Sequence, residues 1–391
     1  MSITAIDAIK SLLKGPANTL GVDAGSYAVK IISLSSGGTS GKYKINAWGY
    51  LPLELETSLE QSQAELRMVY NARLQTFLSQ NRSVTRDTTT GVDGPAIIVR
   101  TISIPKLTYQ ELAKTIQFEA EPFLPVNINE CEIGFHIIGP TKDDPKKMDV
   151  LIAAVKKEAI ENKVSLLNDA GLRTVVVDAN AFALANVYYE MISASSKEKR
   201  KGDSSPKPET VIIMNIGASV TNMILIADGV VKLVRDLAYG GNEFTKSVQR
   251  QMTVDFKGAE KLKTTYGILL SGEDKEKTLA DDKREALSVS IALNTSAKML
   301  VGDIHRFIEF YLGQNPDAVF SRILISGGTA LLPNLISYIS RETNIPTEVF
   351  NPIQVLCSSE DAALIPQQYQ PSLATAFGLA LRKEKDHLSK K

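Results

Sequence analysis

The sequence predicts an α/β protein with a duplicated two-lobe fold and a small α+β subdomain inserted in the first lobe. The chain has 391 residues, which is longer than a usual single domain. One motif occurs twice, at residues 19–35 and 211–229. It consists of an apolar strand, a short polar turn with glycine, and a second apolar strand. A charged stretch rich in Ser and Pro, at 194–209, separates the two copies as a solvated linker would. Two lobes that each begin with the same hairpin explain all three observations.

The composition is that of an ordinary globular protein, and it excludes several classes. Apolar residues make up 43% and charged residues 23% of the chain. Lys and Arg together number 44, as do Asp and Glu, so no basic field indicates a nucleic-acid partner. Two cysteines, Cys131 and Cys357, are too few for a disulfide framework, which favours a reducing, cytoplasmic location. No apolar run reaches the roughly 18 residues that a membrane span needs.

The two ends of the chain carry patterns of their own. Residues 1–16 predict an amphipathic helix because apolar side chains recur there at three- and four-residue steps: Ile3, Ile6, Ile9 and Leu13. Gly15 and Pro16 would end this helix. It either packs on its own protein or docks on a membrane surface or a partner. Residues 383–391 form a basic, solvated tail.

The first half begins as a sheet with a helix on it. A strand meander is expected over 19–53, a polar helix with interspersed apolar residues over 59–80, and a strand over 96–105 that Pro105 closes. We assign residues 17–100 and 171–208 to the core of the first lobe.

Residues 101–170 are expected to form the inserted α+β subdomain. Its first helix starts at Thr108, which has the capping-box spacing with Glu111, and it ends at Pro122. A later helix stops at Gly171. The remaining pattern predicts strand, strand, helix, strand and helix over 131–140, 148–155, 157–170, 172–180 and 181–193.

The second lobe is assigned to residues 209–382. After the repeated hairpin it alternates again between helical and strand patterns. Helices are expected over 242–252, 257–267, 282–314 and 371–383, with a strand, a glycine turn and a helix over 322–340.

The glycine turns suggest a phosphate site. A turn with Gly brings backbone N–H groups against an anion because no Cβ intervenes. Asp23 can hold Mg²⁺ through water, Ser26 offers a hydroxyl, and Lys30 offers a charge for phosphate oxygens. Gly327 and Gly328 stand between a strand and a helix, where a flat base could lie against bare backbone. Each turn alone is more often a simple hairpin or packing turn.

The order hairpin, hairpin, Gly-Gly turn resembles the superfamily of actin-like proteins, sugar kinases and heat-shock ATPases. More narrowly, the chain resembles the PilM family of actin-like type IV pilus assembly proteins, of which cell-division FtsA is a near relative. The resemblance runs from about residue 17 to 380 and includes the inserted subdomain. It rests on "LGVDAGSYAVKIISL", "LTYQELAKTIQFEAEPFLPVNINE", "VDANAFALANVYY", "VIIMNIGASVTNMILIADG", "VRDLAYGGNEFTKSV", "GAEKLKTTYG" and "ILISGGTALLPNL".

This resemblance implies an actin-like fold that binds ATP or ADP with Mg²⁺ between its lobes. The implied first phosphate motif is Asp23, Gly25, Ser26 and Lys30, and the second is Gly217, Ala218, Ser219 and Thr221. On the nucleoside side it implies Gly240 and Gly241, the pair Glu260 and Lys263, and the adenosine turn Gly327, Gly328 and Thr329. Without the family, the Glu260/Lys263 pair would be taken for a solvated helix face, and Gly240–Gly241 for a helix-start turn.

Asn215 departs from the family pattern, which has Asp at this position. An amide cannot accept a proton, and the loss of a positioned acid or base typically lowers a rate by roughly 10²–10⁴. We therefore expect weak or no hydrolysis and name no confident catalytic residue. Asp178 and Asn180 are the alternatives for ordering a water, since they follow a core strand. The three histidines, His136, His305 and His387, have no metal-ligand spacing.

The resemblance implies a nucleotide-binding scaffold, peripheral on the cytoplasmic side of the inner membrane, in a type IV pilus or related secretion machine. Its partner would be the cytoplasmic N-terminus of a PilN-like bitopic membrane protein, bound as an extended peptide between the core and the inserted subdomain. Self-association is left open. The alternatives are an active ATPase or kinase of the superfamily and an FtsA-like filament protein of cell division.

Overall fold

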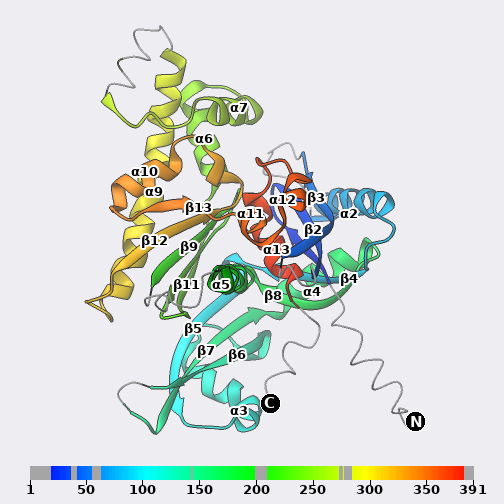
Figure 1. The fold of residues 1–391 in the computed structure, drawn as a ribbon, viewed down its shortest axis with the longest axis vertical. Helices are drawn as coiled ribbons and strands as arrows, with labels where there is room; N and C mark the ends of the chain where they lie inside the picture. The colour runs from blue at the N-terminus through cyan, green and yellow to red at the C-terminus, as the bar shows by residue number, and fades with distance from the viewer. Residues whose placement is uncertain are drawn as a thin grey trace.

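The computed structural model describes residues 19–36, 42–54, 63–141, 144–198, 209–272, 276 and 284–382. These residues form two five-stranded sheets and a separate three-stranded sheet, with helices between and around them (Figure 1). The predicted N-terminal helix, the basic tail and residues 199–208 of the predicted linker lie outside the described residues.

The first lobe is built on a sheet of order β3-β2-β1-β4-β8. The strands are β1 (Leu20–Ala24), β2 (Ala28–Ser36), β3 (Tyr43–Pro52), β4 (Asp87–Val92) and β8 (Arg173–Ala179). The first three form the predicted antiparallel meander, and β4 and β8 run parallel to β1. Helices α2 (Gln63–Gln80) and α4 (Lys157–Asp169) cover one face, where Leu74 and Leu167 meet Val22 and Ile31.

The second lobe repeats this plan with a sheet of order β11-β10-β9-β12-β13. Its strands are β9 (Thr210–Ile216), β10 (Thr221–Ala227), β11 (Val230–Leu237), β12 (Phe320–Ser326) and β13 (Thr347–Val349). Four helices pack on one face: α6 (Gly241–Met252), α7 (Phe256–Tyr266), α9 (Arg284–Leu312) and α10 (Leu335–Thr343). The duplicated arrangement confirms the prediction from the repeated hairpin.

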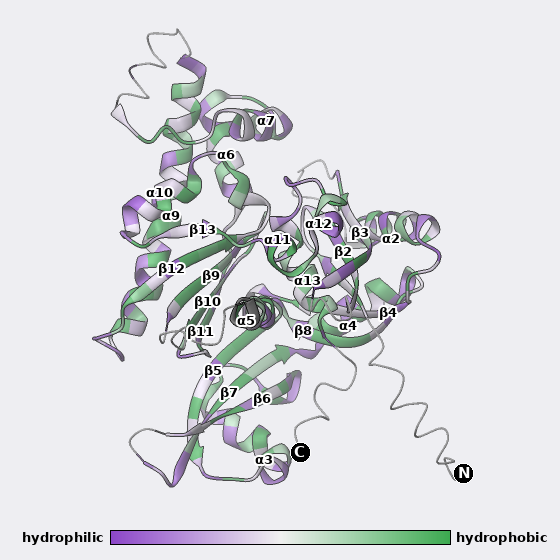
Figure 2. Ribbon diagram, viewed as in Figure 1, coloured by the Kyte–Doolittle hydropathy of each residue, from purple (hydrophilic) through white to green (hydrophobic). Residues whose placement is uncertain are grey.

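The two sheets share a core. Helices α5 (Asn180–Glu198) and α13 (Ala374–Ala380) lie between them, with the short helices α11 (Pro352–Leu356) and α12 (Ser359–Ala363) alongside (Figure 1). Apolar residues of both sheets, such as Ile32 and Ile224, belong to this one cluster. Figure 2 shows the central strands as mostly hydrophobic, whereas α2 and α7 alternate between hydrophobic and hydrophilic residues. The last predicted helix, 371–383, is instead the turn η6 (Pro371–Leu373) followed by the short α13.

The inserted subdomain has its own sheet, of order β5-β7-β6, and its own core. The strands are β5 (Ile97–Pro105), β6 (Cys131–Pro140) and β7 (Lys147–Lys156), all antiparallel. Helix α3 (Tyr109–Ala120) begins with the predicted capping box of Thr108 and Glu111, and the turns η3 (Glu121–Phe123) and η4 (Ile128–Glu130) follow.

The separate sheet therefore spans 97–156, which is shorter than the predicted insertion of 101–170. The difference is α4, whose residue Leu167 is fully buried in the core of the first lobe. Gly171 follows α4 with a φ of +82°, as expected for a glycine that stops a helix. Within the described part of the chain, every helix is too short or too polar to span a bilayer.

Candidate functional site

The first turn joins β1 to β2 and carries an ion pair. Asp23 and Lys30 stand opposite each other in the register of the two strands, and Lys30 Nζ lies 3.0 Å from Asp23 Oδ2. Both side chains are largely buried. A Cβ on Gly25 would lie only 2.6 Å from Lys30 Nζ, so the glycine leaves room for the ammonium group.

Two backbone carbonyl groups of the first turn accept hydrogen bonds from side chains on helices of the first lobe. Tyr70 on α2 donates to Gly25 O at 2.7 Å, and Lys163 on α4 donates to Ala24 O at 2.8 Å. Ser26 is exposed. The backbone is thus fixed while the Ser26 hydroxyl is open to a ligand.

The second turn, between β9 and β10, is held by the backbone of other motifs. Gly241 N donates to Gly217 O at 2.8 Å, and Asn242 N donates to Ala218 O at 2.8 Å. Thr329 Oγ1 donates to the same Gly217 carbonyl at 3.1 Å. The structure therefore brings together the second turn, the start of α6 and the turn η5 (Gly328–Leu331), which are far apart in sequence.

Glycines allow this close packing. A Cβ on Gly240 would lie 2.6 Å from Gly217 O, and one on Gly241 would lie 2.5 Å from Thr329 Oγ1. Gly327 has a φ of +88°, and its Cβ would meet a carbonyl oxygen at 2.4 Å. Gly328 differs, because its Cβ would find no atom closer than 3.7 Å. The sequence predicts that the flat base of a nucleotide lies against the backbone at this open position.

Glu260 and Lys263 on α7 point into this assembly rather than along a solvated face. Lys263 is only 6% exposed, and its Nζ lies 2.6 Å from Glu260 Oε2. The same Nζ donates to Thr245 Oγ1 at 2.9 Å and to Gly241 O at 3.4 Å. Burial lowers the pKa of Lys263, and the Glu260 carboxylate opposes that shift. The solvated-face alternative is therefore wrong.

The first turn and α7 are close enough to interact electrostatically. Burial raises the pKa of the Tyr27 phenol, and the negative charge of Glu260 raises it further. Tyr27 belongs to the first lobe and Glu260 to the second. Tyr27 beside the first turn and Glu260 on α7 therefore lie within electrostatic range of each other, although they belong to different lobes.

Sequence reasoning missed the turn at Asp93 and Gly94, which follows β4. Asn180 Nδ2 donates to Asp93 Oδ2 at 2.8 Å, and Gly94 N donates to Asp236 Oδ2 at 2.7 Å. Burial raises the pKa of Asp93; Lys163 lowers it, and Asp23 raises it. The only sequence signal was the turn-forming "DGP" at 93–95.

The side-chain amide of Asn222 links Asn215 to Asp236 through two hydrogen bonds. Asn215 Nδ2 donates to Asn222 Oδ1 at 3.1 Å, and Asn222 Nδ2 donates to Asp236 Oδ1 at 2.9 Å. Burial raises the pKa of Asp236 to about 6, although the hydrogen bonds from Asn222 and Gly94 counter this. Asn215 is therefore engaged in a hydrogen-bond network of the second sheet.

The remaining predicted residues lie in different surroundings. Asp178 forms an ion pair with Arg382, the last described residue, at 3.0 Å, whereas Asn180 joins the Asp93 turn. Thr221 is fully buried, and its Oγ1 donates to Tyr239 O at 2.7 Å. Ser219 Oγ accepts from the side chain of Asn242 at 3.2 Å. Of the two water-ordering alternatives, Asn180 thus contacts the Asp93 turn directly, whereas Asp178 pairs with Arg382.

Asp23 and Asp93 are the carboxylates near the first turn that suit a magnesium ion. Mg²⁺ usually keeps several waters and takes one or two carboxylates together with substrate phosphates. Within the residues described, no group of three or more His, Cys, Asp or Glu side chains could hold a metal by itself. The donor set therefore fits Mg²⁺ that is brought in with a phosphate chain.

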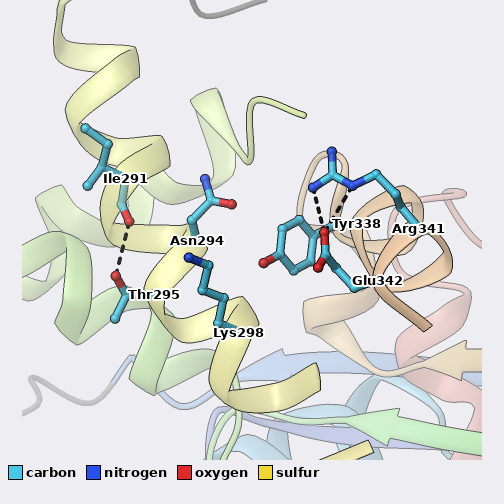
Figure 3. Close-up of a pocket in the computed structure, with 7 residues that line it drawn as sticks. All are labelled: Ile291, Asn294, Thr295, Lys298, Tyr338, Arg341 and Glu342. Carbon is cyan, nitrogen blue, oxygen red and sulfur yellow. Dashed lines mark hydrogen bonds and ion pairs between the residues drawn. The ribbon is translucent and has the colours of Figure 1, made fainter. Parts of the chain in front are cut away.

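Two hollows of the surface are lined by other residues than these turns. One, of about 350 Å³, lies between α9 and α10, where Arg341 stacks over the Tyr338 ring at 5.4 Å and pairs with Glu342 (Figure 3). The other, of about 520 Å³, lies beside the C-terminal end of α2 and includes Arg82 and Arg86. Neither hollow is part of the site described above.

Comparison with known proteins identifies the family and the fold. Residues 21–384 match the family described as type IV pilus assembly protein PilM. A chain of a solved PilM-PilN type IV pilus biogenesis complex has a TM-score of 0.73 and 23% identity, covering 94% of this chain and 99% of that chain. The ethanolamine utilization protein EutJ from Carboxydothermus hydrogenoformans has a TM-score of 0.50 and 14% identity, covering 94% and 90%. These likenesses show the actin-like fold.

Proposed function

Because the chain belongs to the PilM family of type IV pilus assembly proteins, we propose that it is a nucleotide-binding scaffold of such a machine. It binds ATP or ADP with Mg²⁺ between its lobes, on the cytoplasmic side of the inner membrane. The observation that carries this proposal is the convergence of the second turn, Gly241, Lys263 and Thr329 on one another.

The phosphates are bound from both lobes. On the first turn, Ser26 donates its hydroxyl, and Lys30 adds a positive charge that Asp23 holds in place. On the second turn, backbone amides beside Gly217 and Ala218 meet the phosphates. Asp23 would hold Mg²⁺ through water, and the ion would neutralise phosphate charge when bound.

The nucleoside lies against the second lobe. The base stacks over Gly328, where the backbone is bare, beside the side chain of Leu331, which is 42% exposed. Glu260 is partly exposed and accepts hydrogen bonds from ribose hydroxyls. Lys263 is buried below it and holds the Glu260 carboxylate in place.

Hydrolysis is slow or absent in this proposal. Asn215 is an amide whose Nδ2 donates to Asn222, and an amide has no group that can take a proton from the attacking water. Asn180 beside Asp93 is the remaining group that could order a water. The nucleotide then acts as a ligand that favours the closed arrangement of the lobes.

The partner is the N-terminal cytoplasmic segment of a PilN-like bitopic membrane protein, through which the protein is peripheral to the membrane. The solved PilM-PilN type IV pilus biogenesis complex, whose chain has the same fold, supports a PilN-like partner. In this chain β6 is an edge strand of the inserted sheet, so it can pair with an extended peptide. Nearby apolar side chains are unusually exposed, with Phe118 at 77% and Phe123 at 46%.

Calorimetry with ATP and Mg²⁺ tests the nucleotide site. Lys30→Ala removes a charge from the first turn and should weaken binding about tenfold or more. Lys114→Ala removes an exposed lysine of the inserted subdomain and should leave the affinity unchanged. Equal affinities for the wild type and Lys30→Ala would contradict the assignment of the first turn.

A synthetic peptide of the PilN-like segment tests the partner site, with affinity measured by fluorescence polarisation. Phe118→Asp should weaken peptide binding and spare ATP binding. The matched control is Phe310→Asp, which changes an equally apolar side chain, 53% exposed, on α9 of the second lobe. If both variants bound the peptide like the wild type, the exposed aromatics of the insertion would have no part in the interaction.

A further inference from the structure

The turn at Asp93 and Gly94 contacts elements of both lobes. On the first-lobe side, Asp93 accepts from Asn180 at 2.8 Å and lies in the electrostatic field of Asp23 and Lys163. On the second-lobe side, Gly94 N donates to Asp236 on β11 at 2.7 Å. A Cβ on Gly94 would also lie 3.6 Å from the side chain of Val220, a residue of the second turn. One short turn therefore lies beside the second phosphate turn and within the electrostatic range of Asp23 in the first.

From Gly94, polar side chains cross the second sheet in a row. Asn222 stands opposite Asp236 in the β10–β11 register and opposite Asn215 in the β9–β10 register. Residues opposite one another in adjacent strands place their side chains on the same face. The row Asn215, Asn222, Asp236 ends on the Gly94 amide, and we call it the amide ladder.

The carboxylate of Asp236 fixes the direction of every bond in the amide ladder. An ionised carboxylate only accepts hydrogen bonds, so Asn222 must turn its NH₂ group toward Asp236 and its carbonyl oxygen toward Asn215. Residue 215 must then donate to that oxygen, and an asparagine does so at 3.1 Å. An aspartate at 215 would place an acceptor at each end of one amide, which can donate at only one of them.

We propose that the amide ladder and the Asp93–Gly94 turn couple the two phosphate turns, and that residue 215 is Asn because the ladder ends in the acceptor Asp236. The proposal rests on the proposed function for the ligand, a nucleotide with Mg²⁺. Asn215 and Asp236 are positioning residues in it. Binding at the first turn shifts the Asp93 side of the turn, and the ladder transmits that shift to the second turn.

The direction of the hydrogen bonds in the amide ladder predicts that one of three variants is disrupted and the other two are tolerated. Asn215→Asp leaves two facing acceptors and breaks one bond. Asp236→Asn is tolerated, because all three amides can reverse together and Gly94 N still meets an oxygen. The double variant Asn215→Asp/Asp236→Asn restores a full ladder with reversed direction, so it should behave like the wild type.

Hydrogen–deuterium exchange of the segment 93–97 in the nucleotide-free full-length protein measures these effects directly. In Asn215→Asp the repulsion between the two facing acceptors should disturb Asn222 and Asp236, weaken the hydrogen bond from Gly94 N to the charged Asp236, and speed exchange about tenfold. The other two variants should stay near the wild-type rate. Asn129→Asp, which adds the same charge at an exposed site of the insertion, is the matched control and should also exchange normally. A double variant that exchanges as fast as Asn215→Asp would overturn the ladder.

A second measurement adds ATP and Mg²⁺ to the same proteins. The ligand should slow exchange at 93–97 in the wild type and the double variant, and much less in Asn215→Asp. If calorimetry shows that ATP binds the wild type while exchange at 93–97 does not change, the coupling is overturned. If ATP does not bind at all, the proposed function fails, whereas the nucleotide-free exchange rates still decide whether the ladder exists.

Discussion

The two phosphate turns occupy equivalent places in the two lobes but are built differently. The first turn depends on side chains: the Asp23–Lys30 ion pair, the Tyr70 hydroxyl and the Lys163 ammonium group surround it. The second turn depends on backbone and glycine. Its carbonyl groups accept from the start of α6, and Gly240 and Gly327 pack against it with no space for a Cβ.

This difference implies a division of labour between the turns. An exposed side chain such as Ser26 at the first turn can change with little effect on folding, whereas backbone packed against backbone cannot. Substitutions at the glycines around the second turn should therefore damage stability first, and substitution of Ser26 should damage ligand binding first.

The largest effect is expected at Gly327. Gly327→Ala combines a positive φ with a Cβ 2.4 Å from Ile216 O, and should lower the free energy of unfolding by about 3 kcal/mol or more. Urea denaturation measures it. Gly229→Ala is the control, because Gly229 has a φ of +71° but no atom within 4 Å of its Cβ. That variant should cost about 1 kcal/mol. Equal costs would mean that close packing is unimportant at the second turn.

A smaller effect is expected for the buried pair on α7. Lys263→Met removes the partner of Glu260 and of the Thr245 hydroxyl, and should cost about 2 kcal/mol of stability. Lys246→Met on α6 removes a pair of the same i, i+3 spacing that is exposed to solvent, Lys246 with Glu243. It should cost about 0.3 kcal/mol. Thermal unfolding compares the two variants, and similar costs would contradict the burial argument.

Protonation of the Asp236 carboxylate should make the free energy of unfolding depend on pH. Its pKa in the folded protein is about 6, above the ordinary value of 3.8, so the folded state holds the proton more tightly than the unfolded state. The resulting stability is present at low pH and is lost as pH rises through 6. Between pH 5 and pH 7 the loss should be about 1 kcal/mol. Asp236→Asn should remove this component from urea titrations, and an unchanged slope would assign the titration to another group.

The smallest effect on stability is expected at the first turn. Ser26 is exposed, so Ser26→Ala should change the free energy of unfolding by less than about 0.5 kcal/mol. Loss of its hydroxyl should weaken ATP binding about fivefold. A variant that bound ATP normally but unfolded easily would reverse the division of labour between the turns.

Local patterns predicted most of the fold. The duplicated hairpins, the capping box at Thr108 and the stop at Gly171 are all encoded within a few residues, so each could be recognised in the sequence. The assignment of α4 could not, because helical periodicity indicates an apolar face but not the sheet that covers it. The structure shows Leu167 on that face in the core of the first lobe.

In the candidate site, too, local sequence patterns could be predicted, whereas contacts between distant residues could not. Glycine motifs with a fixed order were found, and the structure brings those of the second lobe together. The amide ladder was missed because Asn215, Asn222 and Asp236 meet only through strand register, which no local pattern specifies. The pairing of Asp178 with Arg382 was missed for a similar reason, since the two residues are far apart in the sequence.

The position of α13 sets the order in which the protein can be completed during synthesis. This helix comes last among the described elements, yet it packs on β1, the first strand, and on α5. The fit leaves no space: a Cβ on Gly21 would lie 2.1 Å from Ala376 O, and one on Gly378 would lie 2.1 Å from Ala183 O. Domains generally fold from the N-terminus as the ribosome releases them. Here the first lobe keeps an open apolar face until α13 has been translated, so a ribosome that stalls in the second lobe leaves both lobes unfinished.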